Sequence, residues 1–413
     1  SVGEVMAIGR TFQESFQKAI RMLDIGNDGL VLNRTTGVTY TEEEIEHKLS
    51  HHDDHILYHV AIALKMKISV KRIYALSTVD PWFIEKIQNI VNIEDKLKNS
   101  DLDESLLWEA KKMGFADKQI ARAKDTTPDE IRTLRKNLGV IPSVKQIDTL
   151  AAEWPAVTNY LYLTYGGHSN DVTIPKDEKA IIVLGAGPYR IGSSVEFDWG
   201  TVNMAWGLQE NGEKNVCVVN CNPETVSTDY DTSDRLYFEP LKEEYVFNII
   251  KKEKQKGNLV GVIAQFGGQT PIRLAKFLHD NKFPILGTQY TSIDLAEDRD
   301  RFRKLLDKLR LKQAESGIAK TFKQAIQIAD KIGLPLMVRP SYVLGGRAMK
   351  IVYEKSQLKN FVEEAFKAAE KNPILIDRFI DNAMEIDVDA ISDGKQVFVA
   401  GIMQHIEEAG IHS

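Results

Sequence analysis

The sequence has little cysteine, no long apolar run and no surplus of positive charge. Its 413 residues include two cysteines, Cys217 and Cys221. If both lie on one extended strand, their Cα atoms are ~13 Å apart, beyond the ~7 Å limit for a disulfide. We therefore expect free thiols and a reducing, cytoplasmic compartment. No apolar stretch approaches the ~18 residues of a membrane span, so a soluble protein is expected.

The net charge argues against a protein that binds nucleic acid. The formal net charge is −6, whereas proteins that bind a phosphate backbone usually gather an excess of basic residues on one face. An acidic chain can still bind small anionic substrates where individual arginines line the site. The length predicts about two or three domains. Because the chain starts at Ser1 without methionine and stops at Ser413 soon after a strand pattern, we expect a piece of a longer protein.

The spacing of apolar residues predicts a helix-rich N-terminal part. From about Arg10 to Leu138, apolar residues recur at intervals of three and four. One helix start is specified in detail: Thr127 and Glu130 form a capping box around Pro128, and this helix should stop at Gly139. The segment 141–165 fits neither the helical nor the strand period, and we interpret it as a connection.

Strands and helices alternate after a linker at 166–179, which is typical of a parallel, doubly wound sheet. Strands are predicted at 180–184, 216–219, 259–264 and 283–286, and helices at 195–210, at 243–253 and from Thr270. A third unit begins at Ala296. Its strands are predicted at 335–338, 348–353, 374–379, 385–391 and 397–403.

Two stretches carry the functional signal. Val219–Asp231 follows a strand and is dense in short polar residues, and Arg339–Met349 places an arginine and the pair Gly345-Gly346 between two strands. A glycine loop of this kind closes backbone over phosphate. Arg339 ends an apolar strand, where an unpaired charge would be costly without an anion. Together the stretches indicate a nucleotide-handling α/β enzyme, whereas Arg299 alone also fits a helix-surface charge.

The run Gly185–Gly192 suggests a dinucleotide-binding turn, with Glu224 as the ribose acid. The third glycine of that fingerprint would fall on Arg190, and Pro188 stiffens the turn that should approach pyrophosphate. A Rossmann-like sheet without a dinucleotide is therefore favoured.

A histidine series offers a metal-binding hypothesis. His51, His55 and His59 recur every four residues on a predicted helix, with Asp53 and Asp54 near its start, so they could form a zinc-binding face. A solvated helix face capped by the two aspartates is favoured over that site.

A DNA-binding alternative comes from 115–137, which looks like a helix-turn-helix. Arg132, Arg135 and Lys136 would lie on its second helix. Acidic residues at the N-terminal end of that helix, and the acidic chain as a whole, argue against this alternative.

These residues strongly resemble the large subunit of carbamoyl phosphate synthetase, over the whole chain. The resemblance rests on the strings Gly3–Phe12, Asn220–Pro240 and Arg339–Met349. It implies a mixed α and α/β fold: a helical oligomerisation domain, a Rossmann-like pre-ATP-grasp domain and a truncated ATP-grasp domain. The implied boundaries are 1–40 for the tail of a first ATP-grasp half, 41–172 for the helical domain, 173–295 for the pre-ATP-grasp domain and 296–413 for the incomplete ATP-grasp domain.

The resemblance also implies an activity and partners. The second half of this family phosphorylates carbamate with ATP, an ATP-dependent ligase step that supplies pyrimidine and arginine synthesis. Implied partners are a small glutaminase subunit or domain, further copies through the helical domain, and the substrates ATP, bicarbonate and ammonia. Magnesium or manganese ligands would lie beyond Ser413, so this piece alone should be inactive. Another ATP-grasp ligase acting on a carboxylic acid is the alternative, against which the helical insert argues.

Site residues are implied position by position. Arg299 and Arg339 match two arginines that hold ATP phosphates, and Gly345 and Gly346 match the loop above them. Further nucleotide contacts are implied at Arg378, Ile380, Glu385, Gly410, Ile411, His412 and Ser413. The mouth of a carbamate path is implied at Arg190, Glu196 and Glu224. A monovalent cation such as K⁺ is implied at His405, Glu407 and Glu408.

Overall fold

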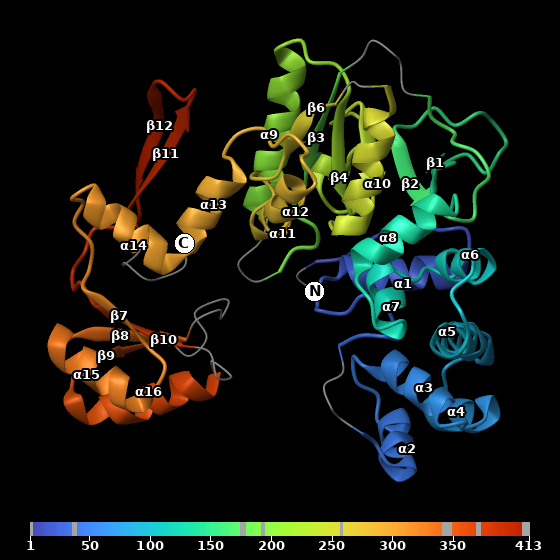
Figure 1. Cartoon of the computed structure of the whole chain (residues 1–413), viewed down its shortest axis with the longest axis horizontal. Coiled ribbons are helices and arrows are strands. Elements are labelled where there is room, and N and C mark those ends of the chain that lie inside the picture. The colour runs from blue at the N-terminus through green and yellow to red at the C-terminus, as the bar shows by residue number, and fades with distance from the viewer. Residues whose placement is uncertain are drawn as a thin grey trace. The chain divides into compact units, whose positions relative to one another are not determined.

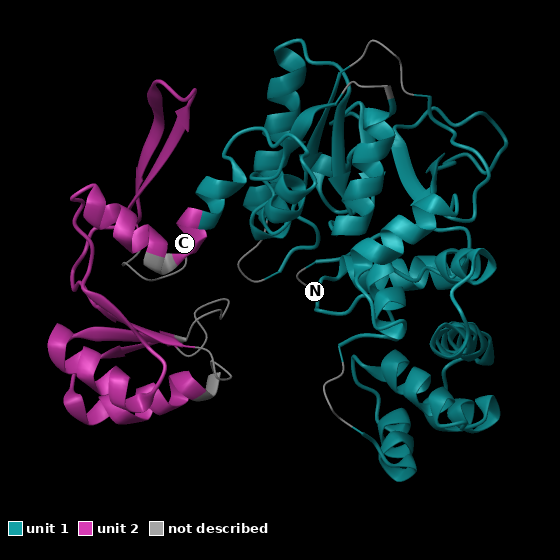
Figure 2. Ribbon diagram, viewed as in Figure 1, with its two compact units in different colours: residues 1–294 teal, residues 295–413 magenta. Residues whose placement is uncertain are grey.

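The computed structural model describes residues 3–34, 39–173, 179–190, 195–256, 259–340, 349–368 and 373–406. The chain divides into two compact units, residues 1–294 and 295–413, which Figure 2 shows in different colours. No described helix is long and apolar enough to cross a membrane.

The first part of unit 1 is helical, as the apolar spacing predicts (Figure 1). Its helices are α1 (Phe12–Met22), α2 (Glu42–Ser50), α3 (Ile56–Lys65), α4 (Val70–Ser77), α5 (Pro81–Asn99), α6 (Glu104–Lys112), α7 (Asp117–Ala123) and α8 (Pro128–Asn137). The predicted capping box of α8 is confirmed, because Thr127 and Glu130 exchange hydrogen bonds between side chain and backbone. Gly139 follows α8 with a φ of +73°, a conformation that favours glycine.

The arginines of the predicted helix-turn-helix are not available to DNA. α7 and α8 do form a pair, but Arg132 and Arg135 are buried against the rest of unit 1. The Arg132 guanidinium lies 4.7 Å from the centroid of the Phe247 ring, and Arg135 Nε lies 3.0 Å from Asp117 Oδ2. The DNA-binding alternative is therefore wrong for these side chains.

The predicted histidine helix is two helices. α2 ends at Ser50 and α3 begins at Ile56, so the series is broken between His51 and His55. The Asp53 carboxylate accepts the backbone N–H of His55 at 2.9 Å, which fixes a turn between the two helices. His59 is buried, so the interpretation of a single solvated helix face is wrong.

The second part of unit 1 is a sheet between helices. Its elements are β1 (Ser143–Gln146), β2 (Tyr160–Thr164), β3 (Ala180–Leu184), α9 (Val195–Glu210), β4 (Val216–Asn220), η1 (Val226–Thr228), β5 (Arg235–Phe238), α10 (Glu243–Glu253), η2 (Lys254–Lys256), β6 (Leu259–Ile263), α11 (Gln269–Ile272), α12 (Ala275–Asp280) and α13 (Tyr290–Glu297). The strand order is β1-β2-β5-β4-β3-β6, and every pair except β1 with β2 is parallel.

The alternation of side chains along the strands explains why helices cover both faces of this sheet. Ile182 and Leu184 of β3 share a core with α10 and α12. Ile181 and Val183, one residue out of phase, share a core with Ala205 of α9. The predicted doubly wound sheet is therefore confirmed.

Two sequence-based expectations about this sheet need correction, and one strand was missed. Segment 141–165 contains strands β1 and β2, and β5 was not predicted at all. The strand expected at 283–286 is reduced to one bridge, between Val262 and Ile285. Strands β1 and β2 thus pair with this sheet, although they precede the proposed domain boundary at residue 172.

Unit 2 contains a four-stranded antiparallel sheet, β7-β10-β8-β9, and a separate β11-β12 hairpin. Its elements are α14 (Arg299–Lys308), β7 (Ser316–Ala319), α15 (Phe322–Ile332), β8 (Leu336–Pro340), β9 (Lys350–Val352), α16 (Lys355–Ala368), β10 (Ile374–Arg378), β11 (Ile386–Ser392) and β12 (Val397–Gln404). Helices α15 and α16 share one core with alternate residues of β8 and β10, including Val338 and Ile376. Both helices therefore pack on the same face of the sheet.

Four buried charged side chains join the helical part of unit 1 to the sheet. Lys111 Nζ lies 3.0 Å from Asp117 Oδ1 and 2.5 Å from Glu244 Oε1. Arg135 pairs with Asp117, and Glu244 also accepts the backbone N–H of Asp117 at 2.6 Å. Glu244 lies in the first turn of α10, and α10 packs on the sheet through Val246 and Ile250. This network therefore fixes α6, α7 and α8 against the helix-covered sheet.

We predict that Lys111→Met destabilises unit 1. The substitution leaves Asp117 and Glu244 buried with one cation fewer, and breaking a buried pair in this way costs about 3–5 kcal/mol. Urea unfolding measures the loss. Lys112→Met is the matched control, because Lys112 is exposed and its change should stay within about 1 kcal/mol. Equal stabilities of the two variants would contradict the role of the network.

We predict that the free energy of unfolding of unit 1 falls at acid pH because of Glu244. Burial opposes ionisation of Glu244, but Lys111 and Arg135 outweigh it and lower the pKa to about 2 from 4.5. Since the unfolded chain then takes up a proton first, the stabilisation is complete above about pH 4.5 and is lost as the pH falls towards 2.

Thermal unfolding between about pH 6 and pH 3 tests this sign. Glu244→Gln should lose less stability than the unchanged chain over that range. Glu243→Gln serves as the control, because Glu243 pairs only across the surface with Lys118 at 3.4 Å. An acid response of Glu244→Gln as steep as that of the control would refute the assignment.

Candidate functional site

The carboxyl ends of the parallel strands in unit 1 meet a segment from the N-terminus of the chain. The backbone N–H of Met6 donates to Cys221 O at 2.9 Å. Gly3 lies so close to Tyr189 that an added Cβ would be 2.4 Å from its carbonyl oxygen. Ligands of doubly wound sheets bind in the crevice outside these strand ends. Here residues 3–8 lie at that edge, which is consistent with the absence of a dinucleotide fingerprint.

The polar stretch after β4 forms a buried hydrogen-bond network. The Asn220 carboxamide oxygen accepts the N–H of Gly187 at 2.9 Å, and its Nδ2 donates to Ser227 Oγ at 2.9 Å. Asp198 of α9 accepts the N–H of Val226 at 2.9 Å. These short side chains therefore hold the loops after β3 and β4 in place, and this is what their density in the sequence signals.

Three cations converge on one carboxylate beside this edge. Asp24 Oδ2 lies 3.2 Å from both Arg190 Nη1 and Arg273 Nη1, and Asp24 also pairs with Lys242. Burial raises the pKa of Asp24, but the hydrogen bond and charge of Lys242, with the two arginines, lower it overall. Arg190 is thus held by a residue of the N-terminal part of the chain.

The two acids predicted beside Arg190 lie near the same strand ends. Glu224 raises the pKa of Glu4 through a side-chain hydrogen bond and charge repulsion, so the two carboxyl groups are adjacent. Burial, followed by the charges of Asp198 and Glu196, raises the pKa of Tyr189 to about 12. The structure therefore brings Arg190, Glu196 and Glu224 to one region, together with Glu4.

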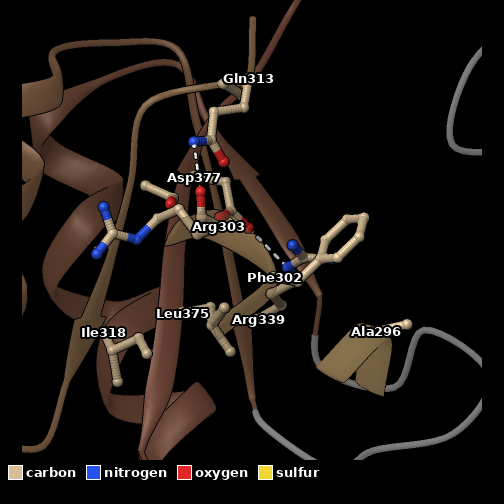
Figure 3. A pocket seen from close by; sticks show the side chains of 11 residues that line it. Ala296, Phe302, Arg303, Gln313, Ile318, Arg339, Leu375 and Asp377 are labelled. Atoms are coloured by element: carbon tan, nitrogen blue, oxygen red, sulfur yellow. Dashed lines mark hydrogen bonds and ion pairs between the residues drawn. The ribbon is translucent and has the colours of Figure 1, made fainter. Parts of the chain in front are cut away.

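Unit 2 carries a pocket of about 510 Å³ on the face of its four-stranded sheet that α15 and α16 leave open (Figure 3). The last turn of α13, helix α14 and the segment before β7 contribute the remaining walls. The lining residues are Ala296, Phe302, Arg303, Gln313, Ala314, Ser316, Gly317, Ile318, Arg339, Leu375 and Asp377.

Arg339 lies in this pocket, but it is not unpaired. Val338 faces the core under α15 and α16, so its neighbour Arg339 points to the open face. Leu375 and Asp377 of β10 lie on that face for the same reason, and Arg339 Nε is 2.6 Å from Asp377 Oδ2. The expectation of an unpaired charge at Arg339 is wrong, because a neighbouring strand supplies its counter-ion.

The other predicted nucleotide contacts are dispersed in unit 2. Arg378 donates from Nη1 to Ile332 O at 2.6 Å, which caps the C-terminus of α15. Ile380 is exposed. His405 Nε2 lies 2.8 Å from Asp387 Oδ2, and its Nδ1 lies 3.9 Å from Glu385 Oε2. The structure thus brings Glu385 and His405 together at the open end of the hairpin.

Several predicted site residues lie outside the described residues, namely Gly345, Gly346, Glu407, Glu408, Gly410, Ile411, His412 and Ser413. Arg299 is the first residue of α14, and the described part of the structure does not include its side chain.

Sequence reasoning missed three acidic partners in these sites. Glu4, Asp24 and Asp377 each approach a predicted site residue from another part of the chain. Asp377 could have been found, because strand alternation places it on the face opposite Ile376. No local signal marks Glu4 or Asp24, since their contacts depend on the path of the N-terminal segment.

The fold, with two compact units that each combine helices and sheets, is that of a multidomain α/β protein. Residues 298–406 match the family model described as the carbamoyl-phosphate synthase L chain, ATP binding domain. Residues 4–139 match the oligomerisation domain of the carbamoyl-phosphate synthetase large chain, and residues 177–295 match the carbamoyl phosphate synthase preATP-grasp domain. The chain belongs to the carbamoyl-phosphate synthetase large-chain family.

Similar curated proteins are much longer than this chain. The carbamoyl phosphate synthase large chain of Archaeoglobus fulgidus is 47% identical over 420 residues, covering 100% of this chain and 38% of that protein. The Xanthomonas axonopodis pv. citri protein of the same name is 48% identical over 421 residues with the same coverage. The chain thus spans 38% of these relatives. The solved N5-carboxyaminoimidazole synthetase of Staphylococcus aureus is 17% identical with a TM-score of 0.42, covering 58% of each chain.

We predict that the strand edge in unit 1 tolerates no side chain at Gly267. A Cβ there would lie 2.3 Å from the carbonyl oxygen of Gly185, so Gly267→Ala must displace backbone and should cost about 1–3 kcal/mol. Gly207→Ala is the control, because Gly207 lies within α9 and its Cβ would meet nothing within 4 Å. That change should stabilise by about 0.5–1 kcal/mol. Thermal unfolding measures both changes. An unchanged unfolding temperature for Gly267→Ala would contradict the close approach of Gly267 to the Gly185 carbonyl oxygen.

Proposed function

We propose that this chain is part of an enzyme that makes carbamoyl phosphate, and that it contributes to the step in which ATP phosphorylates carbamate. The observation that carries the proposal is 47% identity, along the whole chain, to a protein named carbamoyl phosphate synthase large chain. The proposed division into 1–40, 41–172, 173–295 and 296–413 belongs to this function, although β1 and β2 pair with strands of the third segment. The product would supply pyrimidine and arginine synthesis.

The chemistry of the unit 2 pocket supports a phosphate-binding role. Arg339 is about one third exposed and is held through Nε by Asp377, which leaves the far side of a planar guanidinium for a second anion. Phosphoryl transfer spreads negative charge over the moving oxygens, and fixed donors stabilise that charge. We assign phosphate binding to Arg339 and Arg299, with Gly345 and Gly346 closing over the nucleotide.

The remaining nucleotide contacts belong to the same proposal. They are Arg378 and Ile380 towards adenine, Glu385 towards ribose, and the turn of Gly410, Ile411, His412 and Ser413. Because Arg378 Nη1 also donates to Ile332 O, the same side chain would cap the C-terminus of α15 and contact the nucleotide. We assign the carbamate path to Arg190, Glu196 and Glu224, supported by their gathering at one strand edge.

The cation requirements divide into two parts. Magnesium bound with ATP usually takes one or two carboxylates and phosphate oxygens. Among the described pocket residues the carboxylate is that of Asp377, which is engaged with Arg339, so these residues do not fit a magnesium site. We propose that the Mg²⁺ or Mn²⁺ ligands lie elsewhere in the complete protein. K⁺ is proposed at His405, Glu407 and Glu408, supported by the nearby oxygens of Glu385 and Asp387.

The proposed partners follow from the same family. Bicarbonate and ammonia would be the other substrates, with ammonia supplied by a small glutaminase subunit or domain. Self-association would use the helical segment, whose residues 4–139 match a model described as an oligomerisation domain.

We predict that the complete protein forms ATP from ADP and carbamoyl phosphate, and that Arg339→Ala impairs this reaction. Loss of a fixed donor to the transferring phosphoryl group should cost ~2–4 kcal/mol, or roughly 30- to 1,000-fold in rate. A coupled assay of ATP formation measures both rates. The 413-residue chain by itself should give no turnover.

Lys359→Ala is the control variant, because Lys359 is exposed on α16, the helix on the opposite face of the sheet. It should retain the full rate. Equal rates for Arg339→Ala and Lys359→Ala would remove Arg339 from the site. A folded complete protein that binds ADP but makes no ATP from carbamoyl phosphate would move the proposal to a ligase for another acyl phosphate.

A further inference from the structure

Asp24 in unit 1 is the single carboxylate of a cluster that also contains Arg190, Lys242 and Arg273, which we call the Asp24 cluster. Arg190 and Arg273 each place Nη1 3.2 Å from Asp24 Oδ2, and Lys242 pairs with Oδ1. Within the described residues, these three cations form no ion pair with a second acid. The Asp24 cluster therefore has an excess of positive charge.

The local backbone does not explain a carboxylate at position 24. Asp24 follows Leu23, the C-cap of α1, and has a φ of +54°. Glycine or asparagine usually ends a helix in this left-handed conformation. A negative charge is also unfavourable at the C-terminal end of a helix, where the backbone carbonyl groups point. The charge of Asp24 is therefore explained by the three cations, which come from distant segments.

One donor of the Asp24 cluster lacks an acceptor. Arg190 Nη2 is buried and has no hydrogen-bond partner among the described residues, whereas Nη1 donates to Asp24. Buried polar groups in proteins nearly always have partners. A guanidinium group presents its donors in a planar fork, which matches the planar oxygens of a carboxylate-type anion. Arg190 Nη2 is therefore suited to bind a second anion.

The Asp24 cluster lies near the carboxyl ends of the parallel strands. Burial raises the pKa of the Cys221 thiol to about 12, and the charges of Arg190, Asp24 and Lys242 also act on this pKa. These groups are therefore close to Cys221, which directly follows β4. Ligands of doubly wound sheets bind outside this edge. A small anion that reaches the strand ends would meet the cluster there.

We propose that the Asp24 cluster binds a small planar oxyanion of the carboxylate type, such as bicarbonate or carbamate, and that Asp24 competes with this anion for the three cations. The anion would accept a hydrogen bond from Arg190 Nη2. Arg273, whose side chain is 54% exposed, can turn from Asp24 towards it. The inference rests on the carbamate path proposed above and adds Asp24, as a positioning residue, with Lys242 and Arg273 to that path.

Competition by Asp24 suits an anion in transit. An ion that moves along a path must bind well enough to enter a site and weakly enough to leave it. Without the charge of Asp24, the same three cations would attract a passing anion more strongly. Removal of that charge should therefore tighten anion binding, whereas loss of a purely structural contact would weaken binding or leave it unchanged. The sign of the change separates the two roles.

The test measures binding of ¹³C-labelled bicarbonate to the 413-residue chain, by NMR line broadening at constant pH and ionic strength. We expect saturable binding that formate displaces and chloride displaces less well. Arg190→Gln and Arg273→Met should each weaken binding by about threefold or more, and Asp24→Asn should tighten it by about the same factor. Asparagine keeps the size of the side chain and suits the left-handed end of α1, so this variant changes the charge alone.

Lys276→Met and Asp280→Asn are the matched controls, because these residues form a surface ion pair on α12, and both variants should bind bicarbonate as the unchanged chain does. If Arg190→Gln fails to fold, the more exposed Arg273 still decides. Absence of saturable binding would overturn the proposal. So would weaker binding by Asp24→Asn, or displacement by chloride as effective as that by formate.

The binding measurement is independent of turnover, so this inference and the proposed function can fail separately. Saturable bicarbonate binding, together with a complete protein that makes no ATP from carbamoyl phosphate, would support the anion site and remove carbamate as its ligand. ATP formation by the complete protein without bicarbonate binding to the chain would overturn the Asp24 cluster as a site and leave the proposed function intact.

Discussion

The burial of opposite charges between the helices and the sheet is the constraint on which unit 1 depends. Lys111, Asp117, Arg135 and Glu244 are each at least nine-tenths buried as side chains, and an uncompensated charge at such depth costs several kcal/mol. Each is neutralised only when α6, α7, α8 and α10 take their observed positions. The network therefore specifies one arrangement of helices on sheet, which apolar packing alone specifies less sharply.

A second buried pair extends the same logic to the N-terminus. Lys18 Nζ contacts Glu239 Oε1, Ile8 O and Leu163 O, each at 2.8 Å. These contacts join α1 to the end of β5 and to β2. With α1 fixed there, residues 3–8 pass the carboxyl ends of the strands, and Asp24 after α1 reaches Arg190. Two segments far apart in sequence thus build the strand-edge site together.

The local sequence pattern was sufficient to predict an element where neighbouring residues determine its boundaries. The capping box of α8 and the apolar runs of β3 and β4 could be read directly, because caps and buried strands depend on neighbouring residues. β1, β2 and β5 are short strands whose pairing depends on distant partners, so their sequences alone indicate little. The same reason explains Arg132 and Arg135, which look like surface cations on α8 and are buried by residues more than a hundred positions away.

The candidate pocket of unit 2 shows what the alternation of residues along a strand predicts about one side chain. Period-two alternation places Arg339 on the face opposite Val338, and this is enough to direct its guanidinium away from α15 and α16. Alternation also places Asp377 on the face opposite Ile376, but the pairing of β10 with β8 is what brings Asp377 beside Arg339. An arginine held through Nε by a fixed carboxylate loses less conformational freedom when it binds a further anion. For the proposed phosphate-binding role of Arg339, Asp377 would therefore fix the guanidinium in advance while reducing the net positive charge that a phosphate group would meet.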